Sequence, residues 1–132
     1  MRSYHIDIAR HATDAERKWI DNLLSHFDIP GVERTQRGSP RRITPTGVYH
    51  IALTRLIALE LDTTLRSAVA FAAALLRAEP DEWRVFPGFS FSFDRTAFES
   101  AVEARITEAV ETVVPAKRGR PPARPVSPSA GS

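Results

Sequence analysis

Apolar side chains recur along most of this chain at helical spacing. A stripe over residues 15–27 returns every three or four positions and predicts a helix that ends at Pro30-Gly31. Thr13 and Glu16 have the spacing of a capping box, which places Thr13 as the N-cap of that helix. Residues 4–12 fit two further helical turns, for which Ser3 is the expected N-cap.

A short basic segment then breaks the helical pattern. Residues 32–35 and 41–43 read as strands, and the turn between them holds Gly38. The segment carries four arginines and one acidic residue. We therefore expect a basic β-hairpin between the second helix and the next one.

Two apolar helices are predicted to follow the hairpin. Thr44-Pro45 gives an N-cap and a proline at the first helical position, and the helix over 45–61 is apolar almost all round. It should be the central core helix. Residues 62–64 interrupt the pattern and cap a second helix over 65–78.

The pattern changes again after residue 78. Residues 83–86 and 89–93 read as strands around Pro87-Gly88, and the run FSFSF places aromatic rings on one face. Asp94 is the expected cap of a last helix to about Val114, which Pro115 is expected to end. The apolar stripe of that helix is formed by Phe98, Val102, Ile106, Ala109 and Val113. Residues 116–132 are too rich in Pro, Ser, Gly and Arg to build a core, and we expect disorder there.

Composition limits the classes of protein that fit. The 132 residues suffice for one small domain and a tail, no cysteine is present, and no apolar run has the length of a signal or membrane span. These features favour a cytoplasmic protein. The four histidines lack metal-ligand spacing, and neither a hydrolase motif nor a phosphate-binding glycine loop occurs. We expect no cofactor, no metal and no enzymatic activity.

The net charge of +2 conceals an uneven distribution. Residues 1–55 balance to +3, residues 56–114 to −5 and residues 115–132 to +4, and sixteen of the eighteen basic residues are arginine. Arginine suits bidentate contacts with phosphate and guanine. The two basic ends favour binding to a polyanion, with double-stranded DNA as the expected partner.

The tail contains Lys117-Arg118-Gly119-Arg120-Pro121. This run resembles an AT-hook, a peptide that lies in the minor groove of A·T-rich DNA. Glycine adds no bulk between the two arginines, so both can enter a narrow groove of high negative potential. The resemblance implies a minor-groove contact by residues 117–120.

The order of the expected elements resembles a winged helix-turn-helix, and within that group a MerR-type DNA-binding domain over about residues 4–77. The most specific stretch runs from Gly38 to Pro45, GSPRRITP, with Val48 after it. The resemblance implies that the second helix enters the major groove and that the hairpin is an arginine-bearing wing. The chain departs from the family in its short first helix, in a turn without glycine and in the absence of a long dimerising coiled coil. Effector sensing is therefore not implied.

The candidate DNA contacts fall into three groups. The second helix would present Arg17, Lys18, Asn22 and His26 to the major groove, the wing would place Arg34, Arg37, Arg41 and Arg42 on phosphates, and the tail would add Lys117, Arg118, Gly119 and Arg120. The alternative interpretation of the first two groups is that these polar side chains only face solvent and do not contact DNA.

The expected fold is mainly α, a winged helix-turn-helix with a short basic β-hairpin wing followed by a C-terminal β-hairpin and helix. Its expected parts are a DNA-binding domain at 1–78, a possible dimerisation element at 79–114 and a basic tail at 115–132. A homodimer could form if the edges of the FSFSF strands pair. The expected function is that of a transcriptional regulator or nucleoid-associated factor. The alternative is a protein-interaction adaptor, antitoxin-like or accessory to a defence system, without a direct role on DNA.

Overall fold

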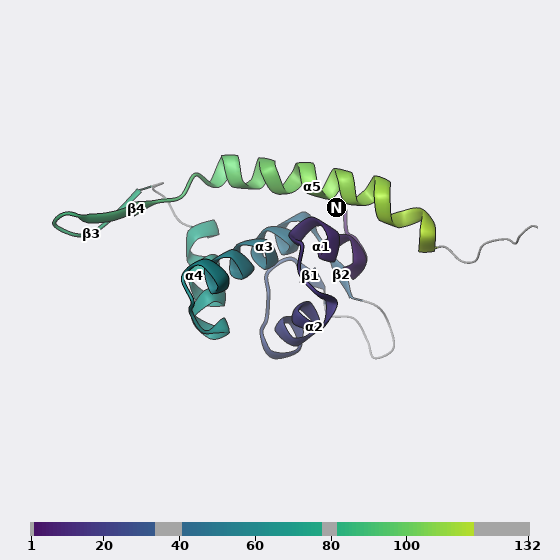
Figure 1. The fold of residues 1–132 in the computed structure, drawn as a ribbon, viewed down its shortest axis with the longest axis horizontal. Coiled ribbons are helices and arrows are strands. Elements are labelled where there is room, and N and C mark those ends of the chain that lie inside the picture. Colours follow the sequence, from purple (N-terminus) through teal and green to yellow (C-terminus); the bar gives the residue numbers. More distant parts are fainter. Residues whose placement is uncertain (1, 34–40, 78–81, 118–132) are drawn as a thin grey trace, which may run out of the picture.

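The protein is described here by a computed structural model covering residues 2–33, 41–77 and 82–117. Within these ranges it is mainly helical, with two separate two-stranded antiparallel sheets (Figure 1). The elements in chain order are α1 (Ile6–Thr13), α2 (Arg17–His26), β1 (Val32–Glu33), β2 (Arg42–Ile43), α3 (Pro45–Glu60), α4 (Leu65–Arg77), β3 (Glu82–Phe86), β4 (Phe89–Ser92) and α5 (Arg95–Lys117). The mainly α prediction with two small hairpins is confirmed.

The caps of the first two helices differ from the prediction. His5, not Ser3, caps α1, and its Nδ1 accepts a hydrogen bond from the backbone N–H of Asp7 at 3.1 Å. The capping box at Thr13 is wrong, because Thr13 is the buried last residue of α1 and its hydroxyl donates to the Ala9 carbonyl at 2.7 Å. A left-handed Asp14 (φ 58°) ends α1, and α2 begins after Glu16 without a side-chain cap.

The first sheet is short and is extended by the N-terminal segment. Val32 pairs with Ile43, and Tyr4 forms a bridge on the other edge of Ile43, with backbone hydrogen bonds of 2.8 and 2.9 Å. Ile43 is fully buried at the centre of this arrangement. The N-terminus therefore holds β2 against the body.

Helix α3 is the core helix, as predicted. Its expected cap is confirmed, since Thr44 Oγ1 accepts from the Gly47 N–H at 3.3 Å and Pro45 follows at the first helical position. Val48 and Ile51 are fully buried. Thr64 and Asp94 cap α4 and α5 through bonds of 3.1 and 3.0 Å from the Ser67 and Ala97 N–H groups, so those cap predictions are confirmed as well.

Helix α5 lies along α1 and α3 (Figure 1). The predicted stripe of Val102, Ile106 and Ala109 is buried in the same cluster as the side chains of α1, α2 and α3. Helix α5 follows the boundary expected at residue 78, yet it shares its core with the helices that precede that boundary. The helix also continues to Lys117, so the expectation that Pro115 would end it is wrong. A proline lacks one N–H donor, and here the helix continues through it for a further two residues.

A polar contact joins α5 to α3 and to the N-terminal segment. The Tyr49 hydroxyl donates to Glu103 Oε2 at 2.6 Å, and Arg2 lies 3.1 Å from the same oxygen. Burial and the Glu103 carboxylate raise the pKa of Tyr49 well above its ordinary value. Tyr49 is therefore a neutral donor at physiological pH.

The second hairpin, β3–β4, rests on a smaller apolar cluster. Trp83 stacks on Phe91 with ring centroids 5.0 Å apart, and Phe71 of α4 meets Phe91 edge-on at 5.6 Å. Phe93 packs on Phe98 at the start of α5. The hairpin projects past α4 at the end of the molecule away from α1 (Figure 1).

Acid should destabilise the protein through His50, which is buried on α3. Burial, and secondarily the charge of Arg77 on α4, lower the pKa of His50 below its ordinary 6.5. The unfolded chain therefore takes up the proton more readily, so the stability contributed by neutral His50 is complete above pH 6.5 and is lost as the pH falls below it. Each tenfold difference in proton affinity corresponds to about 1.4 kcal/mol.

Denaturant unfolding at several pH values would measure this effect. The free energy of unfolding should fall less between neutral and mildly acidic pH in His50→Gln than in the natural chain. Because the two proteins differ only at position 50, equal losses in the two would contradict the role of His50.

Candidate nucleic-acid interface

Helix α2 has one buried face and one polar face. Ile20, Leu23 and Leu24 are buried in the core. The opposite face surrounds a shallow hollow whose polar lining includes Lys18, Asp21, Asn22, Ser25 and His26. Helix α2 itself lies on the side of the molecule away from α5 (Figure 1). A helix held by its apolar face in this way presents its polar side chains outward on a rigid support.

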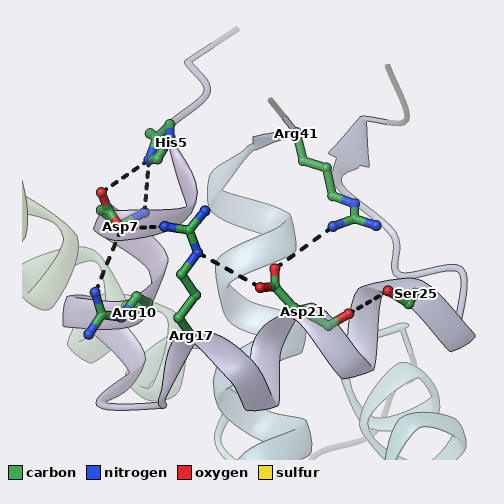
Figure 2. A network of polar contacts seen from close by, with 7 residues as sticks. All are labelled: His5, Asp7, Arg10, Arg17, Asp21, Ser25 and Arg41. Atoms are coloured by element: carbon green, nitrogen blue, oxygen red, sulfur yellow. Dashed lines mark hydrogen bonds and ion pairs between the residues drawn. The ribbon is translucent and has the colours of Figure 1, made fainter. Parts of the chain in front are cut away.

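A chain of alternating charges runs from α1 across α2 to the start of β2 (Figure 2). Asp7 Oδ1 lies 3.7 Å from Arg10 NH1 and 3.8 Å from Arg17 NH1. Asp21 Oδ2 lies 3.8 Å from Arg17 Nε, and Asp21 Oδ1 lies 4.0 Å from Arg41 NH1. Three guanidinium groups are thereby aligned across three elements. We call these five residues the arginine chain.

The arginine chain is positively charged and loosely paired. Two carboxylates face three guanidinium groups, which leaves one positive charge in excess. Its ion-pair distances of 3.7 to 4.0 Å are at the long limit for such contacts, and Arg10 and Arg17 are about half exposed. Pairs of this kind contribute only about 0–1 kcal/mol each to stability. The guanidinium groups can therefore exchange a carboxylate for another anion at little cost.

Ser25 lies one helical turn after Asp21 on α2. Ser25 Oγ donates to the Asp21 backbone carbonyl at 2.7 Å, and this contact lies in the same view as the arginine chain (Figure 2). Asp21 joins α2 to the beginning of the return strand through Arg41. It also places a negative charge at the centre of the face expected to meet DNA.

Arg42 has a different environment from Arg41. Its Nε donates to Ser3 Oγ at 3.2 Å and its NH2 donates to the Ser3 carbonyl at 2.7 Å. These bonds fasten β2 to the N-terminal segment. Arg42 is thus occupied by an internal contact, whereas Arg41 belongs to the arginine chain.

The other predicted residues of α2 lie on its exposed face. Lys18, Asn22 and His26 are all exposed to solvent. His26 Nδ1 lies 2.9 Å from the Asn22 backbone carbonyl, so this nitrogen donates and the ring is fixed along the helix. The side chains of Lys18 and Asn22 border the same hollow.

Several predicted contacts fall outside the described residues. Arg34, Arg37, Arg118, Gly119 and Arg120 are among them, and Lys117 is the last residue of α5. Near its C-terminal end, α5 shares a hollow with the turn between α1 and α2, because Thr112 and Val113 line it together with Arg10, Asp14 and Glu16.

The structure adds Asp7 and Arg10 to the site predicted from the sequence. Their three-residue spacing within α1 was readable as a helical ion pair, but nothing in the sequence placed them next to α2. The link from Asp21 to Arg41 spans twenty positions and depends on the tertiary fold.

Within the described residues no group of three or more His, Asp or Glu side chains is arranged to hold a metal ion. Among the same residues no helix has the length and apolarity to cross a membrane.

Comparison of the chain with family models, with curated proteins and with solved structures gave no match.

Proposed function

We propose that this protein binds double-stranded DNA through α2 and the β1–β2 wing, as a transcriptional regulator or nucleoid-associated factor. The observation that carries the proposal is the arginine chain, which aligns Arg10, Arg17 and Arg41 along one face across α1, α2 and the wing. Phosphate oxygens would replace the weakly held carboxylates. Such contacts fix the position of a protein on DNA without reading its sequence.

Sequence reading would come from the exposed face of α2. Asn22 can bond adenine through two hydrogen bonds and Lys18 can bond guanine. Both side chains are exposed and border one hollow, and the arginine chain flanks them. This arrangement supports the resemblance to a winged helix-turn-helix of MerR type, in which the second helix enters the major groove.

The basic tail would add a second, weaker contact. It follows α5, the helix that packs along α1, so a minor-groove peptide starting at Lys117 would be tethered to the same folded unit as the first contact. Tethering raises the effective concentration of a weak binding segment and can multiply the overall affinity.

Removing the charge of Asp21 should tighten DNA binding. In Asp21→Asn the central negative charge disappears and Arg17 and Arg41 lose a competitor for phosphate. Two charges about 4 Å apart interact by about 1 kcal/mol in water, so the expected decrease in Kd is about fivefold. Glu60→Gln, the same charge change at the exposed end of α3, is the matched control and should leave Kd nearly unchanged. Weaker binding by Asp21→Asn would contradict this prediction and would identify Asp21 as a support for the wing.

Fluorescence anisotropy with random and A·T-rich duplexes across a salt series would test the proposed function. We expect log Kd to rise linearly with log salt, with a slope of about 0.9 for each phosphate contacted. A chain ending at Lys117 should lose preference for the A·T-rich duplex while it keeps the salt dependence. Absence of binding at low salt would exclude the proposal.

A second candidate function, that of a protein-interaction adaptor, is favoured by the exposed tip of the β3–β4 hairpin. Phe86 and Phe89 at the tip of the β3–β4 hairpin are 71% and 60% exposed. Exposed aromatic side chains next to one another are typical of a protein-binding surface. An adaptor without a DNA role would bind its partner normally when the arginines of the arginine chain are replaced by alanine.

A further inference from the structure

Trp19 is a large apolar side chain at the edge of the polar face of α2. It is half-buried, and it packs against the core cluster that also contains Ile20 and Leu23. The same side chain borders the shallow hollow on the outer face of the helix, together with Asn22 and His26. The core therefore holds the indole from one side, while part of it remains at the surface where the polar face begins.

Helical spacing places Trp19 on one flank of this polar face and the arginine chain on the other. Successive residues of an α-helix are separated by about 100° around its axis. Arg17 and Trp19 are thus nearly opposite each other around α2, whereas Trp19 and Asn22 are separated by only about 60°. Lys18 and Asn22 lie between the two flanks, where both are exposed. The face therefore offers cations on one flank, hydrogen-bonding groups at its centre and an aromatic ring on the other flank.

The thymine methyl group is the apolar group that the bases present in the major groove of DNA. Adenine presents N7 and N6 at this edge, and the thymine paired with it presents O4 and the C5-methyl group. The amide of Asn22 fits the adenine of such a pair, because it can donate to N7 and accept from N6. An aromatic ring beside Asn22 can cover the methyl group of the paired thymine and remove apolar surface from water. A G·C pair has no methyl group at this edge.

We infer that Trp19 is a specificity-determining residue, whose indole contacts the C5-methyl group of a thymine while Asn22 bonds the adenine paired with it. The inference rests on the proposed function and deepens it, because it names an A·T base pair as part of the recognised site. The core packing of Trp19 fixes the ring before DNA arrives, so little side-chain freedom is lost on binding. Burial of one methyl group corresponds to about a fourfold gain in affinity.

Tryptophan fluorescence reports directly on whether DNA covers Trp19. The chain contains two tryptophans, and the second, Trp83, lies on β3 and stacks on Phe91. Trp83→Phe keeps an aromatic ring there and leaves Trp19 as the sole tryptophan, whose quenching by acrylamide should fall when duplex DNA binds. Trp19→Phe, in which Trp83 alone emits, is the matched control and should show unchanged quenching. Quenching of Trp19 that stays the same at saturating duplex would overturn the inference.

Replacing thymidine by deoxyuridine tests the methyl contact itself, because it removes the methyl group and no hydrogen-bonding atom. A duplex selected from a random library with the natural chain is prepared in both forms. The Kd of the natural chain should rise about fourfold for each methyl group contacted. Trp19→Ala, with its helix content checked by circular dichroism, should bind both forms alike. The basic tail does not produce this difference, because A·T and A·U pairs present the same acceptors in the minor groove.

The outcomes separate this inference from the proposed function. Equal affinity of the natural chain for the two forms of the duplex, with the salt dependence intact, would overturn the methyl contact and leave the proposed DNA binding in place. Failure to bind any duplex at low salt would overturn both. The comparison uses the natural chain, so it remains decisive if Trp19→Ala does not fold.

Discussion

Replacing Arg17 and Arg41 together by alanine is expected to raise the Kd for duplex DNA about 100-fold at low salt, because a hydrogen bond to a charged group contributes about 1.5 kcal/mol or more. Both guanidinium groups belong to the arginine chain, one on α2 and one at the start of the wing's return strand. Their removal should also lower the slope of log Kd against log salt by about 1.8, which corresponds to two phosphate contacts.

The loss should come from the interface and not from unfolding. The ion pairs of Arg17 and Arg41 lie at 3.8 to 4.0 Å and are partly exposed, so the melting temperature should change little. Arg84→Glu changes the net charge by the same amount at an exposed position of the hairpin and is the matched control. If that control weakens binding as much as the double variant, net charge alone governs affinity and α2 has no special role.

Arg42 offers an internal comparison. Because its Nε and NH2 atoms are bonded to Ser3, Arg42→Ala should act mainly through the attachment of β2 to the N-terminal segment. Stability measurements and anisotropy on the same samples would separate the two roles of these neighbouring arginines.

Replacing Gly31 by alanine is expected to lower the free energy of unfolding by about 2 to 5 kcal/mol. Gly31 has φ 87°, and the left-handed region costs a residue with a Cβ about 1–2 kcal/mol. An added Cβ would also lie within 3 Å of the Gly47 backbone nitrogen and of Thr44 Oγ1, which exceeds what packing tolerates and adds about 1–3 kcal/mol. The close approach exists because the Gly31 carbonyl accepts both the Thr44 N–H at 2.9 Å and the Thr44 hydroxyl at 2.8 Å.

The second hairpin provides a control for the backbone conformation alone. Gly88 has φ 82°, and no atom lies within 4 Å of a Cβ added there. Gly88→Ala should therefore cost about 1–2 kcal/mol, the conformational part only. Chemical unfolding of the two variants would measure the difference. Equal losses would show that the contact between Gly31 and the start of α3 contributes nothing.

The local elements follow from local chemistry, and the sequence predicted them. The apolar stripes of α2 and α5, the caps at Thr44, Thr64 and Asp94, and the FSFSF alternation appear in the structure where the pattern placed them. Each depends on residues within a few positions of one another, for which helical and strand spacing are sufficient guides.

Two positions depart from the local preference. Thr13 has the spacing of a cap, but burial at the end of α1 turns its hydroxyl back to Ala9. Pro115 was expected to end α5, yet the helix runs on to Lys117.

The mainly α fold class, the caps at Thr44, Thr64 and Asp94 and the basic character of both ends were determined by the sequence alone, because each depends on the identity and spacing of nearby residues. The tertiary structure decided which charges meet. It joined Asp21 to Arg41 and brought Asp7 to Arg17, and it turned Arg42 inward to Ser3. It also placed α5 along α1 while leaving Phe86 and Phe89 uncovered. These outcomes depend on distances between elements far apart in the chain, and spacing along a sequence contains no measure of those distances.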